Sequence, residues 1–436
     1  MSTEPSSNAH RARYARSQYR AKSHDEGHAA DEHAPDESGR AHHALAPRGP
    51  ASVVTTQDAL SELVAHLRES RSFGYDSEFI GELTYIPKLC VIQVASATRV
   101  ALIDPLAGLE LREFWELLCD PMVEKIVHAG QQDIEPVFRN VARPCANVFD
   151  TQIATGFIGM AYPVALGKLA AELVGVRLGK ALTFSHWDQR PLSPMQLRYA
   201  ADDVRYLPAM RSEIGKRLEA TGHADWAKAE SESLCEPSQY RFSPETYYQR
   251  VRGATSLPPQ GLAVLRELTI WRDAVARKHD VPPRAYLKDE ILLDLSRSPA
   301  KSVDRLAKVR GLPRPVENED GADIVAATLR GLAVPTASQP ASRTVEPSPA
   351  ERFRVDALWA AAQILCSGRS IDSALVTSRQ EIGEFYRTAT NGGELESLHL
   401  FQGWRREALG EPLAKLMRGE LQFDVRWANG TLALIE

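Results

Sequence analysis

The sequence predicts an α/β domain followed by two smaller, mostly helical domains. A chain of 436 residues is too long for one ordinary domain. Short apolar runs typical of strands lie near residues 72–79, 88–96, 99–104 and 124–129, with segments of helical spacing between and after them. After Leu257, apolar residues repeat at helical spacing. These patterns indicate a sheet with flanking helices in the first half of the chain and helical domains in the second.

The first fifty residues differ in composition from the rest of the chain. They contain six of the twelve histidines, with many Ala, Ser, Arg and acidic residues and almost nothing to bury. The spacing of these histidines matches no defined metal site. We therefore expect residues 1–50 to form a disordered extension.

The run from Phe73 to Phe79 carries the first candidate site residues. If it is a strand, its period of two sends Asp76 and Glu78 out of the same face. Both carboxylates could then reach one cation.

A helix is expected to start at Ser193-Pro194-Met195-Gln196, which has a capping Ser, Pro at the first helical position and Gln three residues after the cap. Tyr199 and Asp203 are four residues apart and share one face of that helix. Asp202 points about 100° away from Asp203, and we expect it to face solvent. Pro208 should kink or end the helix.

Three further residues have competing structural explanations. Asp133 is a candidate metal ligand, but on its own it could equally cap the helix that contains Pro136. Asp150, directly before Thr151, is expected to cap a helix rather than to bind a metal. His128 ends an apolar run, where a packed or hydrogen-bonded histidine is the common case.

Together, Asp76, Glu78, Asp133, Asp203 and Tyr199 have the chemistry of a phosphodiester-cleaving centre. Cleavage requires a strong nucleophile, charge stabilisation on the phosphoryl oxygens and help for the leaving 3′ oxygen. Two divalent ions about 4 Å apart supply all three. Hard cations such as Mg²⁺ prefer oxygen ligands, and a tyrosine hydroxyl could orient the attacking water or accept its proton.

The segments around these residues resemble the three exonuclease motifs of the DEDD superfamily, in its tyrosine-bearing branch, and are most similar to those of the bacterial ribonuclease D family. The likeness runs from about residue 51 to 210 and includes the stretches 85–93, 102–106, 149–152 and 187–192. It implies a ribonuclease-H-like fold, with a mixed five-stranded sheet and helices on both faces.

The resemblance also implies a role for each site residue. Asp76 would bridge two Mg²⁺ or Mn²⁺ ions, while Glu78 and Asp203 would hold the ion that activates water. Asp133 would support the second ion, directly or through water. Tyr199 would position the nucleophile.

The helical stretch 253–335 resembles the HRDC domain, a nucleic-acid-binding module shared by certain helicases and ribonuclease D. Although the net charge of the chain is −5, residues 272–314 hold eleven Lys or Arg against six Asp or Glu. This basic segment could contact phosphates, or it could be a merely solvated helical surface.

Composition predicts a linker over 336–349, and we expect a connecting helical segment over 216–252. The resemblance implies an exonuclease domain over 51–215. Residues 350–436 resemble the second, more divergent HRDC-like domain of ribonuclease D. This last segment ends in an apparent hairpin near 423–435, with Asn429-Gly430 at its turn.

The expected activity is that of a 3′–5′ exoribonuclease that releases nucleoside 5′-monophosphates by two-metal hydrolysis, in the maturation of tRNA or other small stable RNA. One alternative is a 3′–5′ DNA exonuclease of the same superfamily, with single-stranded DNA as ligand, because the metal centre contacts phosphates. Another is a non-catalytic RNA-binding scaffold. Retention of all five centre residues argues against the scaffold, since binding alone does not require an activated water.

Composition is compatible with this activity. The chain has no apolar run long enough to span a membrane and no apolar signal core at its start. Its five cysteines are widely spaced, which favours reduced thiols over a disulfide framework or a zinc site. We expect a cytoplasmic monomer without membrane association.

Overall fold

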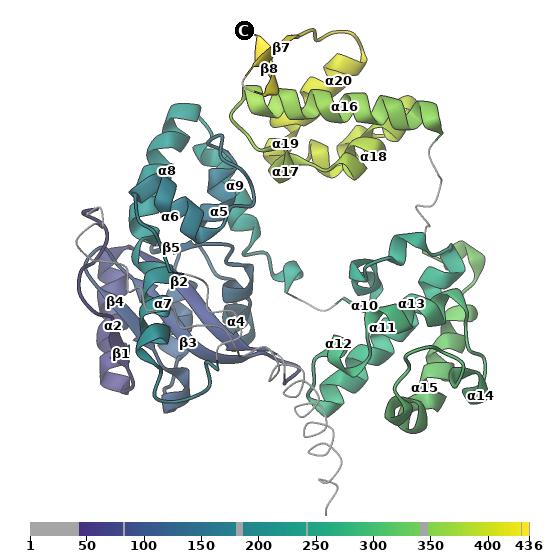
Figure 1. Ribbon diagram of the computed structural model, residues 1–436, viewed down its shortest axis with the longest axis horizontal. Helices are drawn as coiled ribbons and strands as arrows, with labels where there is room; N and C mark the ends of the chain where they lie inside the picture. Colours follow the sequence, from purple (N-terminus) through teal and green to yellow (C-terminus); the bar gives the residue numbers. More distant parts are fainter. Residues whose placement is uncertain are drawn as a thin grey trace, which may run out of the picture. The chain divides into compact units, whose positions relative to one another are not determined.

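The computed structural model describes residues 43–81, 83–179, 186–240, 243–340, 348–428 and 430–435, and the chain forms two compact units (Figure 1). The first, here called the helical unit, contains the described residues of 79–89 and 241–346. The second, here called the sheet unit, contains the described residues of 35–78, 90–240 and 347–436.

Within the described residues, the sheet unit is built on a six-stranded mixed sheet with the order β1-β4-β3-β2-β5-β6. The strands β1–β4 and β5–β2 pair in parallel, as do β5 and β6, while β3 and β4 pair antiparallel. Their bounds are β1 (Ser52–Val54), β2 (Ser72–Ile80), β3 (Lys88–Ala95), β4 (Val100–Ile103), β5 (Glu124–Val127) and β6 (Val148–Asp150).

The four strands expected from apolar runs are present as β2 to β5, and the mixed sheet is confirmed. The expected number of five strands is wrong, because β1 and β6 bring it to six. Each of these two strands has three residues, which is too short to show a period of two in the sequence.

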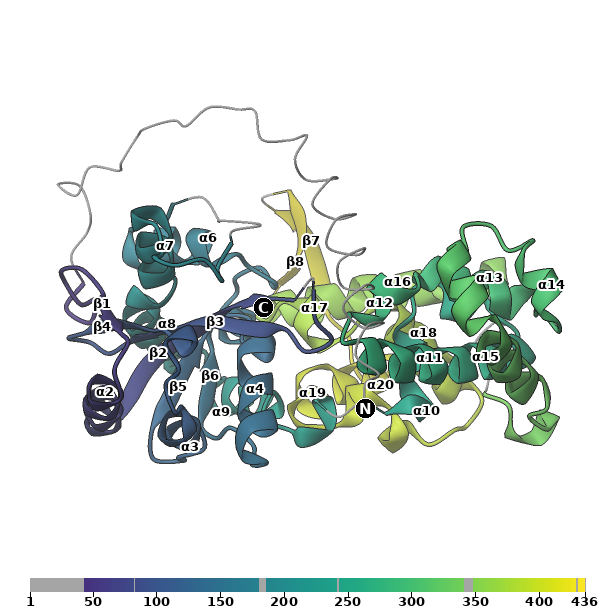
Figure 2. The same cartoon turned by 90° about the horizontal axis from the view of Figure 1, so that it is seen from below.

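Helices cover both faces of this sheet. In Figure 2, α2, α3 and α4 lie on one side of it, and α6 and α7 lie on the other. The helices up to residue 233 are α2 (Gln57–Ser70), α3 (Arg112–Leu118), α4 (Gln131–Val141), α5 (Thr151–Thr155), α6 (Leu166–Val174), α7 (Pro194–Arg205), α8 (Leu207–Thr221) and α9 (Ala224–Ser233).

The C-terminal part of the sheet unit is mostly helical and ends in a hairpin. Its elements are α16 (Pro349–Gly368), α17 (Ser373–Val376), α18 (Arg379–Thr390), α19 (Gly403–Arg405), a π-helix (Arg406–Gly410), α20 (Glu411–Met417), β7 (Asp424–Ala428) and β8 (Thr431–Ile435). The predicted hairpin is confirmed, since β7 and β8 pair antiparallel from Asp424↔Ile435 to Ala428↔Thr431. The sequence assignment of this part as a second HRDC-like domain stays a prediction.

One continuous apolar core joins the sheet to these C-terminal helices. It contains Phe157 and Met210 from the first part of the sheet unit together with Leu375, Phe385 and Leu409 from the last. The C-terminal part is therefore packed as an integral layer of the sheet unit.

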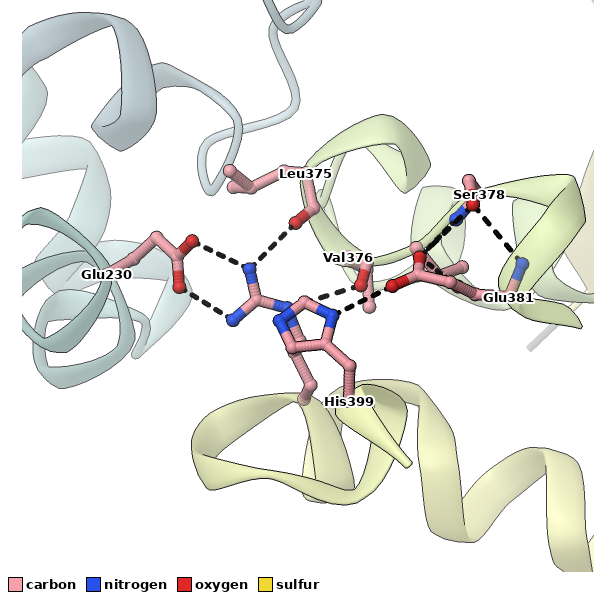
Figure 3. Close-up of polar contacts among 8 residues, drawn as sticks. Glu230, Leu375, Val376, Ser378, Glu381 and His399 are labelled. Carbon is pink, nitrogen blue, oxygen red and sulfur yellow. Dashed lines mark hydrogen bonds and ion pairs between the residues drawn. The ribbon is translucent and has the colours of Figure 1, made fainter. Parts of the chain in front are cut away.

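A buried ion pair lies within this layer. Arg405 donates two hydrogen bonds to the carboxylate of Glu230 on α9, at 2.6 and 2.7 Å, and the indole of Trp404 donates to the same carboxylate at 2.8 Å. Figure 3 shows Glu230 facing the segment that contains Leu375 and Val376, and His399 in contact with Glu381. The Trp404 ring meets the ring of Phe157 edge-on, with centroids 4.7 Å apart.

The expected disordered extension is too long at its C-terminal end. Residues 1–42 lie outside the described residues, but Pro47 is buried, and Leu45 and Ala46 pack against the core of the sheet unit. Arg205 donates to the carbonyl oxygen of Pro47 at 2.7 Å. Residues 45–47 are thus packed, because contacts that composition does not reveal fix this segment.

The helical unit is centred on α11, which packs against α13 and α15. Its helices are α10 (Pro244–Tyr247), α11 (Pro259–His279), α12 (Pro283–Tyr286), α13 (Asp289–Arg297), α14 (Val303–Leu306) and α15 (Arg314–Leu332). Within the same unit the hydroxyl of Tyr85 donates to Asp273 at 2.6 Å, and the guanidinium of Arg277 lies 4.6 Å from the Tyr85 ring centroid.

The predicted linker is shorter than 336–349. Thr336–Ser338 form a 3₁₀ turn and Gln339 donates to Gln260 at 3.0 Å, so the first residues of this range pack in the helical unit. Residues 341–347 lie outside the described residues, and α16 begins at Pro349.

In the described part of the chain, no helix is both long and apolar enough to cross a bilayer.

Candidate active site

Strand β2 has two different faces around the first candidate residues. Asp76 and Glu78 are half-buried on one face, while Tyr75 and Ser77 are buried on the other. The predicted alternation of this strand is confirmed. Because β2 lies inside the sheet between β3 and β5, both carboxylates are held on a rigid element.

Gly74 brings β2 close to the helices that follow the last motif. A Cβ atom at this position would lie 2.9 Å from the carbonyl oxygen of Val204 in α7 and 2.9 Å from the Cβ of Leu207 in α8. A larger residue would therefore push α7 and α8 away from the strand. Gly74 was not singled out from the sequence, although a lone Gly inside a strand indicates a close approach of another backbone.

Helix α7 begins as the sequence predicts. Ser193 and Gln196 form a reciprocal capping box with Pro194 in the first turn, and the helix ends at Arg205, before Pro208. Tyr199 and Asp203 lie on one face of α7, where burial and then the charge of Asp203 raise the pKa of the phenol.

Asp133 lies in the first turn of α4, but it does not cap that helix, whose N-cap is Gly130. The Ser77 hydroxyl donates to its Oδ1 atom, and the Tyr75 hydroxyl donates to its backbone oxygen at 2.8 Å. Tyr75 and Ser77 were not singled out from the sequence, although the strand period places them together opposite Asp76.

The structural explanations for Asp150 and His128 are confirmed. Asp150 caps α5 through the amides of Gln152 and Ile153, and it also accepts hydrogen bonds from the amides of Ala129 and Gly130. It thereby fixes the turn that leads into α4. The ring nitrogens of His128 contact the Thr151 hydroxyl and the Val164 carbonyl oxygen, each at 3.0 Å.

The expectation that Asp202 faces solvent is wrong. Its carboxylate is buried and pairs with Arg205 at 3.3 Å. The Asp202 side chain points away from Asp203, as predicted. However, other parts of the sheet unit cover the side of α7 on which Asp202 lies.

The five predicted residues influence one another electrostatically. Burial raises the pKa of Asp76 to about 6. Burial and the charge of Asp76 raise the pKa of Glu78 to about 8. Burial and the charges of Asp76 and Glu78 raise the pKa of Asp203 to about 8, and the pKa of Asp133 is also raised, by burial and then by Asp76. These carboxyl groups therefore share one site that concentrates negative charge.

This donor set fits hard divalent cations. All of its donors are oxygen atoms. Burial and mutual repulsion raise the pKa values of its carboxyl groups, and a bound cation would offset both effects. Across the described ranges, no three His, Cys, Asp or Glu side chains are gathered tightly enough to hold a cation as they stand. The role of each residue as a ligand therefore stays a prediction.

The raised pKa values predict how stability depends on pH without metal. A carboxyl group whose pKa is higher in the folded than in the unfolded protein takes up a proton on folding. Its contribution to the free energy of unfolding is therefore present at low pH and lost as the pH rises. The loss falls between about pH 4.5 and about pH 8 for Glu78, and between about pH 3.8 and about pH 8 for Asp203. In EDTA, we expect the melting temperature to be about 5 °C lower at pH 8.5 than at pH 6.

The check is differential scanning fluorimetry of the protein in EDTA across this range, with and without added Mn²⁺. Mn²⁺ should restore the melting temperature at pH 8.5, and the double variant Glu78→Gln, Asp203→Asn should show a flatter pH dependence and little response to Mn²⁺. An equal response of variant and wild type would contradict this assignment of the site.

Comparison with known families assigns two parts of the chain. Residues 51–219 match the 3′-5′ exonuclease family, and residues 261–328 match the HRDC domain family. All five predicted site residues lie within the first of these ranges.

Relatives match almost the whole described chain. The chain is 35% identical to a ribonuclease D from Gluconacetobacter diazotrophicus, over 86% of this chain and 95% of that protein. It is 34% identical to a ribonuclease D from Granulibacter bethesdensis, over 85% of this chain and 93% of that protein. Its structure is similar to the crystal structure of Escherichia coli RNase D, an exoribonuclease involved in structured RNA processing, with a TM-score of 0.74, 27% identity, and coverage of 86% of this chain and 100% of that chain.

Proposed function

Because this chain belongs to the ribonuclease D family of 3′–5′ exoribonucleases, we propose that it removes nucleoside 5′-monophosphates from RNA 3′ ends at a divalent metal centre formed by Asp76, Glu78, Asp133 and Asp203. The observation that carries the proposal is the convergence of these four carboxyl groups and Tyr199, from β2, α4 and α7, on one electrostatically coupled site.

The chain's own groups have distinct parts in this reaction. Two bound Mg²⁺ or Mn²⁺ ions would lower the pKa of an attacking water and offset charge on the entering and leaving oxygens. The charge of Asp76 acts on all three other carboxyl groups, and Asp76 would contact both ions. Glu78 and Asp203 would hold the ion on the water side, and Asp133, oriented by Ser77, would support the second ion.

Tyr199 is better suited to orient the nucleophile than to accept its proton. Burial and the charges of Asp203, Glu78 and Asp76 raise the pKa of the phenol well above its ordinary value. The hydroxyl therefore stays protonated at neutral pH and acts as a hydrogen-bond donor.

The helical unit is proposed to bind the body of the RNA. Several of its arginines are already paired with acidic groups: Arg272 and Arg284 with Asp289, and Arg277 with Asp273. Five exposed basic residues lie on and around α14, namely Lys301, Arg305, Lys308, Arg310 and Arg314. Such a cluster suits RNA phosphates, and tRNA precursors or other small structured RNAs are the proposed substrates.

The test is incubation of the full chain with 3′-labelled RNA and with DNA of the same sequence, in Mg²⁺ or Mn²⁺. We expect the label to appear as a nucleoside 5′-monophosphate from RNA, to require the metal, and to be absent with the Asp76→Ala variant. An RNA with a stem and a single-stranded 3′ tail should be shortened up to the stem.

DNA trimmed as fast as RNA or faster would favour the rival DNA exonuclease. Unchanged RNA trimming in EDTA, or by the Asp76→Ala variant, would contradict the proposed centre. Tight RNA binding without any trimming would favour the non-catalytic scaffold.

A further inference from the structure

Arg190 uses its whole guanidinium group in hydrogen bonds. It lies in the segment 186–193, directly before α7. Its Nε and Nη2 atoms each donate to the Asp104 carboxylate at 2.6 Å, and Nη2 also donates to the Cys90 carbonyl oxygen at 2.7 Å. Its Nη1 atom donates to the carbonyl oxygens of Trp187 and Gln189, each at 2.7 Å. All five N–H donors of the side chain are thus engaged.

These partners connect three parts of the sheet unit. Cys90 belongs to β3, and Asp104 directly follows β4. Asp104 is itself fixed, because its amide donates to the Val54 carbonyl oxygen at 3.0 Å and its carboxylate accepts from the amide of Leu106 at 2.9 Å. Arg190 therefore holds the segment before α7 against β3 and the end of β4 by hydrogen bonds.

The segment 186–193 lies against Tyr199 of the candidate site. The Trp187 side chain is 3% exposed, and its ring centroid lies 6.1 Å from that of Tyr199 at an interplanar angle of 41°. The Gln196 side chain contacts the His186 carbonyl oxygen at 3.4 Å, which also holds the segment onto the first turn of α7. Trp187 thus limits, from one side, the positions that the Tyr199 ring can adopt.

We propose that Arg190, through its paired hydrogen bonds to Asp104, is a positioning residue for Tyr199, which it controls by holding Trp187 against the phenol ring. This inference rests on the proposed function, in which the Tyr199 hydroxyl orients the attacking water. Lysine cannot replace Arg190 in this role, because a single ammonium group cannot bond both carboxylate oxygens and three carbonyl oxygens in one plane. Loss of these Arg190 hydrogen bonds leaves the N-terminal cap of α7 in place but lets Trp187 and Tyr199 shift.

The experiment is a double-variant cycle on a short single-stranded RNA, with kcat, KM and melting temperature measured for Arg190→Lys, Tyr199→Phe and the combined variant. We expect Arg190→Lys to lower kcat about 10- to 100-fold, since a shift of about 1 Å in a reacting group has an effect of this size. KM should change less than about twofold, because the donors of the guanidinium group are all engaged within the protein. In the Tyr199→Phe background, Arg190→Lys should cause no further loss of kcat.

Arg112→Lys is the matched control, because Arg112 pairs with Glu116 at 3.1 Å on the exposed side of α3. It should leave both kinetic parameters unchanged. Asp104→Asn and Trp187→Leu should reproduce the fall in kcat if Arg190, paired with Asp104, holds Trp187 against the Tyr199 ring.

Two results would overturn the inference while leaving the proposed function intact: wild-type kcat in Arg190→Lys, or losses that multiply in the combined variant. Wild-type kcat in Tyr199→Phe would instead contradict the proposed role of Tyr199, and with it the inference. A fall in melting temperature that accounts for the lost activity of Arg190→Lys would also overturn it, since a merely structural residue would behave in that way.

Discussion

Replacing Asp203 by Asn should lower the turnover number at least about 10³-fold while leaving RNA affinity nearly unchanged. The amide keeps the shape of the side chain but removes a charged ligand, and loss of metal-based stabilisation of the transition state is worth several kcal/mol. Asp76→Asn should have an equal or larger effect, because the charge of Asp76 is, after burial, the largest cause that raises the pKa of Glu78, Asp133 and Asp203. Single-turnover kinetics with saturating protein and fluorescence anisotropy with labelled RNA measure the two quantities separately.

Asp202→Asn is the matched control for this experiment. It makes the same chemical change one residue away, on a carboxylate that pairs with Arg205 instead of facing Tyr199. We expect it to keep most of the wild-type turnover. If Asp203→Asn retained more than about a tenth of the wild-type rate, Asp203 would not be a ligand of the catalytic metal.

The second large effect concerns the ion pair between Glu230 and Arg405. Arg405→Ala should lower the melting temperature of the sheet unit by about 5 °C or more, because removing one partner of a buried ion pair costs about 3 kcal/mol. The side chains are 16% and 11% exposed, and the abandoned Glu230 would keep only the indole of Trp404 as a donor. Thermal unfolding monitored by circular dichroism measures the change.

Arg406→Ala provides the control, since the neighbouring Arg406 pairs with Glu411 on the surface, where both side chains are about half exposed. Its melting temperature should stay close to that of the wild type. If Glu230 and Arg405 are coupled, the variant Glu230→Gln, Arg405→Met should be more stable than Arg405→Ala. Equal melting temperatures for Arg405→Ala and Arg406→Ala would show that the C-terminal part does not depend on this contact.

The shared core has a consequence for how the C-terminal part is studied. Because its apolar residues lie in one cluster with Phe157 and Met210, a truncation before α16 would expose the core of the sheet unit. Loss of activity in such a truncation would report on stability as much as on RNA binding. Point variants on the surface of α14 or α16 separate these effects more cleanly.

The sequence predicted the local part of the candidate site well. The alternation of Asp76 and Glu78 on β2 and the capping box that starts α7 both depend on neighbouring residues, so their signals are visible in a short stretch of chain. The identity of the family followed from the combination of three such stretches.

Long-range contacts account for what the sequence could not predict. The hydrogen bonds from Arg190 to Asp104 join residues 86 positions apart, and the close approach of Gly74 to Val204 joins residues about 130 positions apart. Burial of Asp202 and the packing of residues 43–50 depend likewise on surfaces supplied by distant segments. The strands β1 and β6 exist because the sheet offers them a neighbour, and not because of their own pattern.

The most direct measurement of the proposed centre is anomalous diffraction from crystals of the protein grown or soaked with Mn²⁺. We expect a strong peak about 2.2 Å from carboxylate oxygens of Asp76, Glu78 and Asp203, and a second peak between Asp76 and Asp133 about 4 Å from the first. The same crystals of the Asp76→Asn variant should lose at least one of the two peaks. Absence of any peak at these residues in the wild type, with Mn²⁺ bound elsewhere in the crystal, would contradict the account.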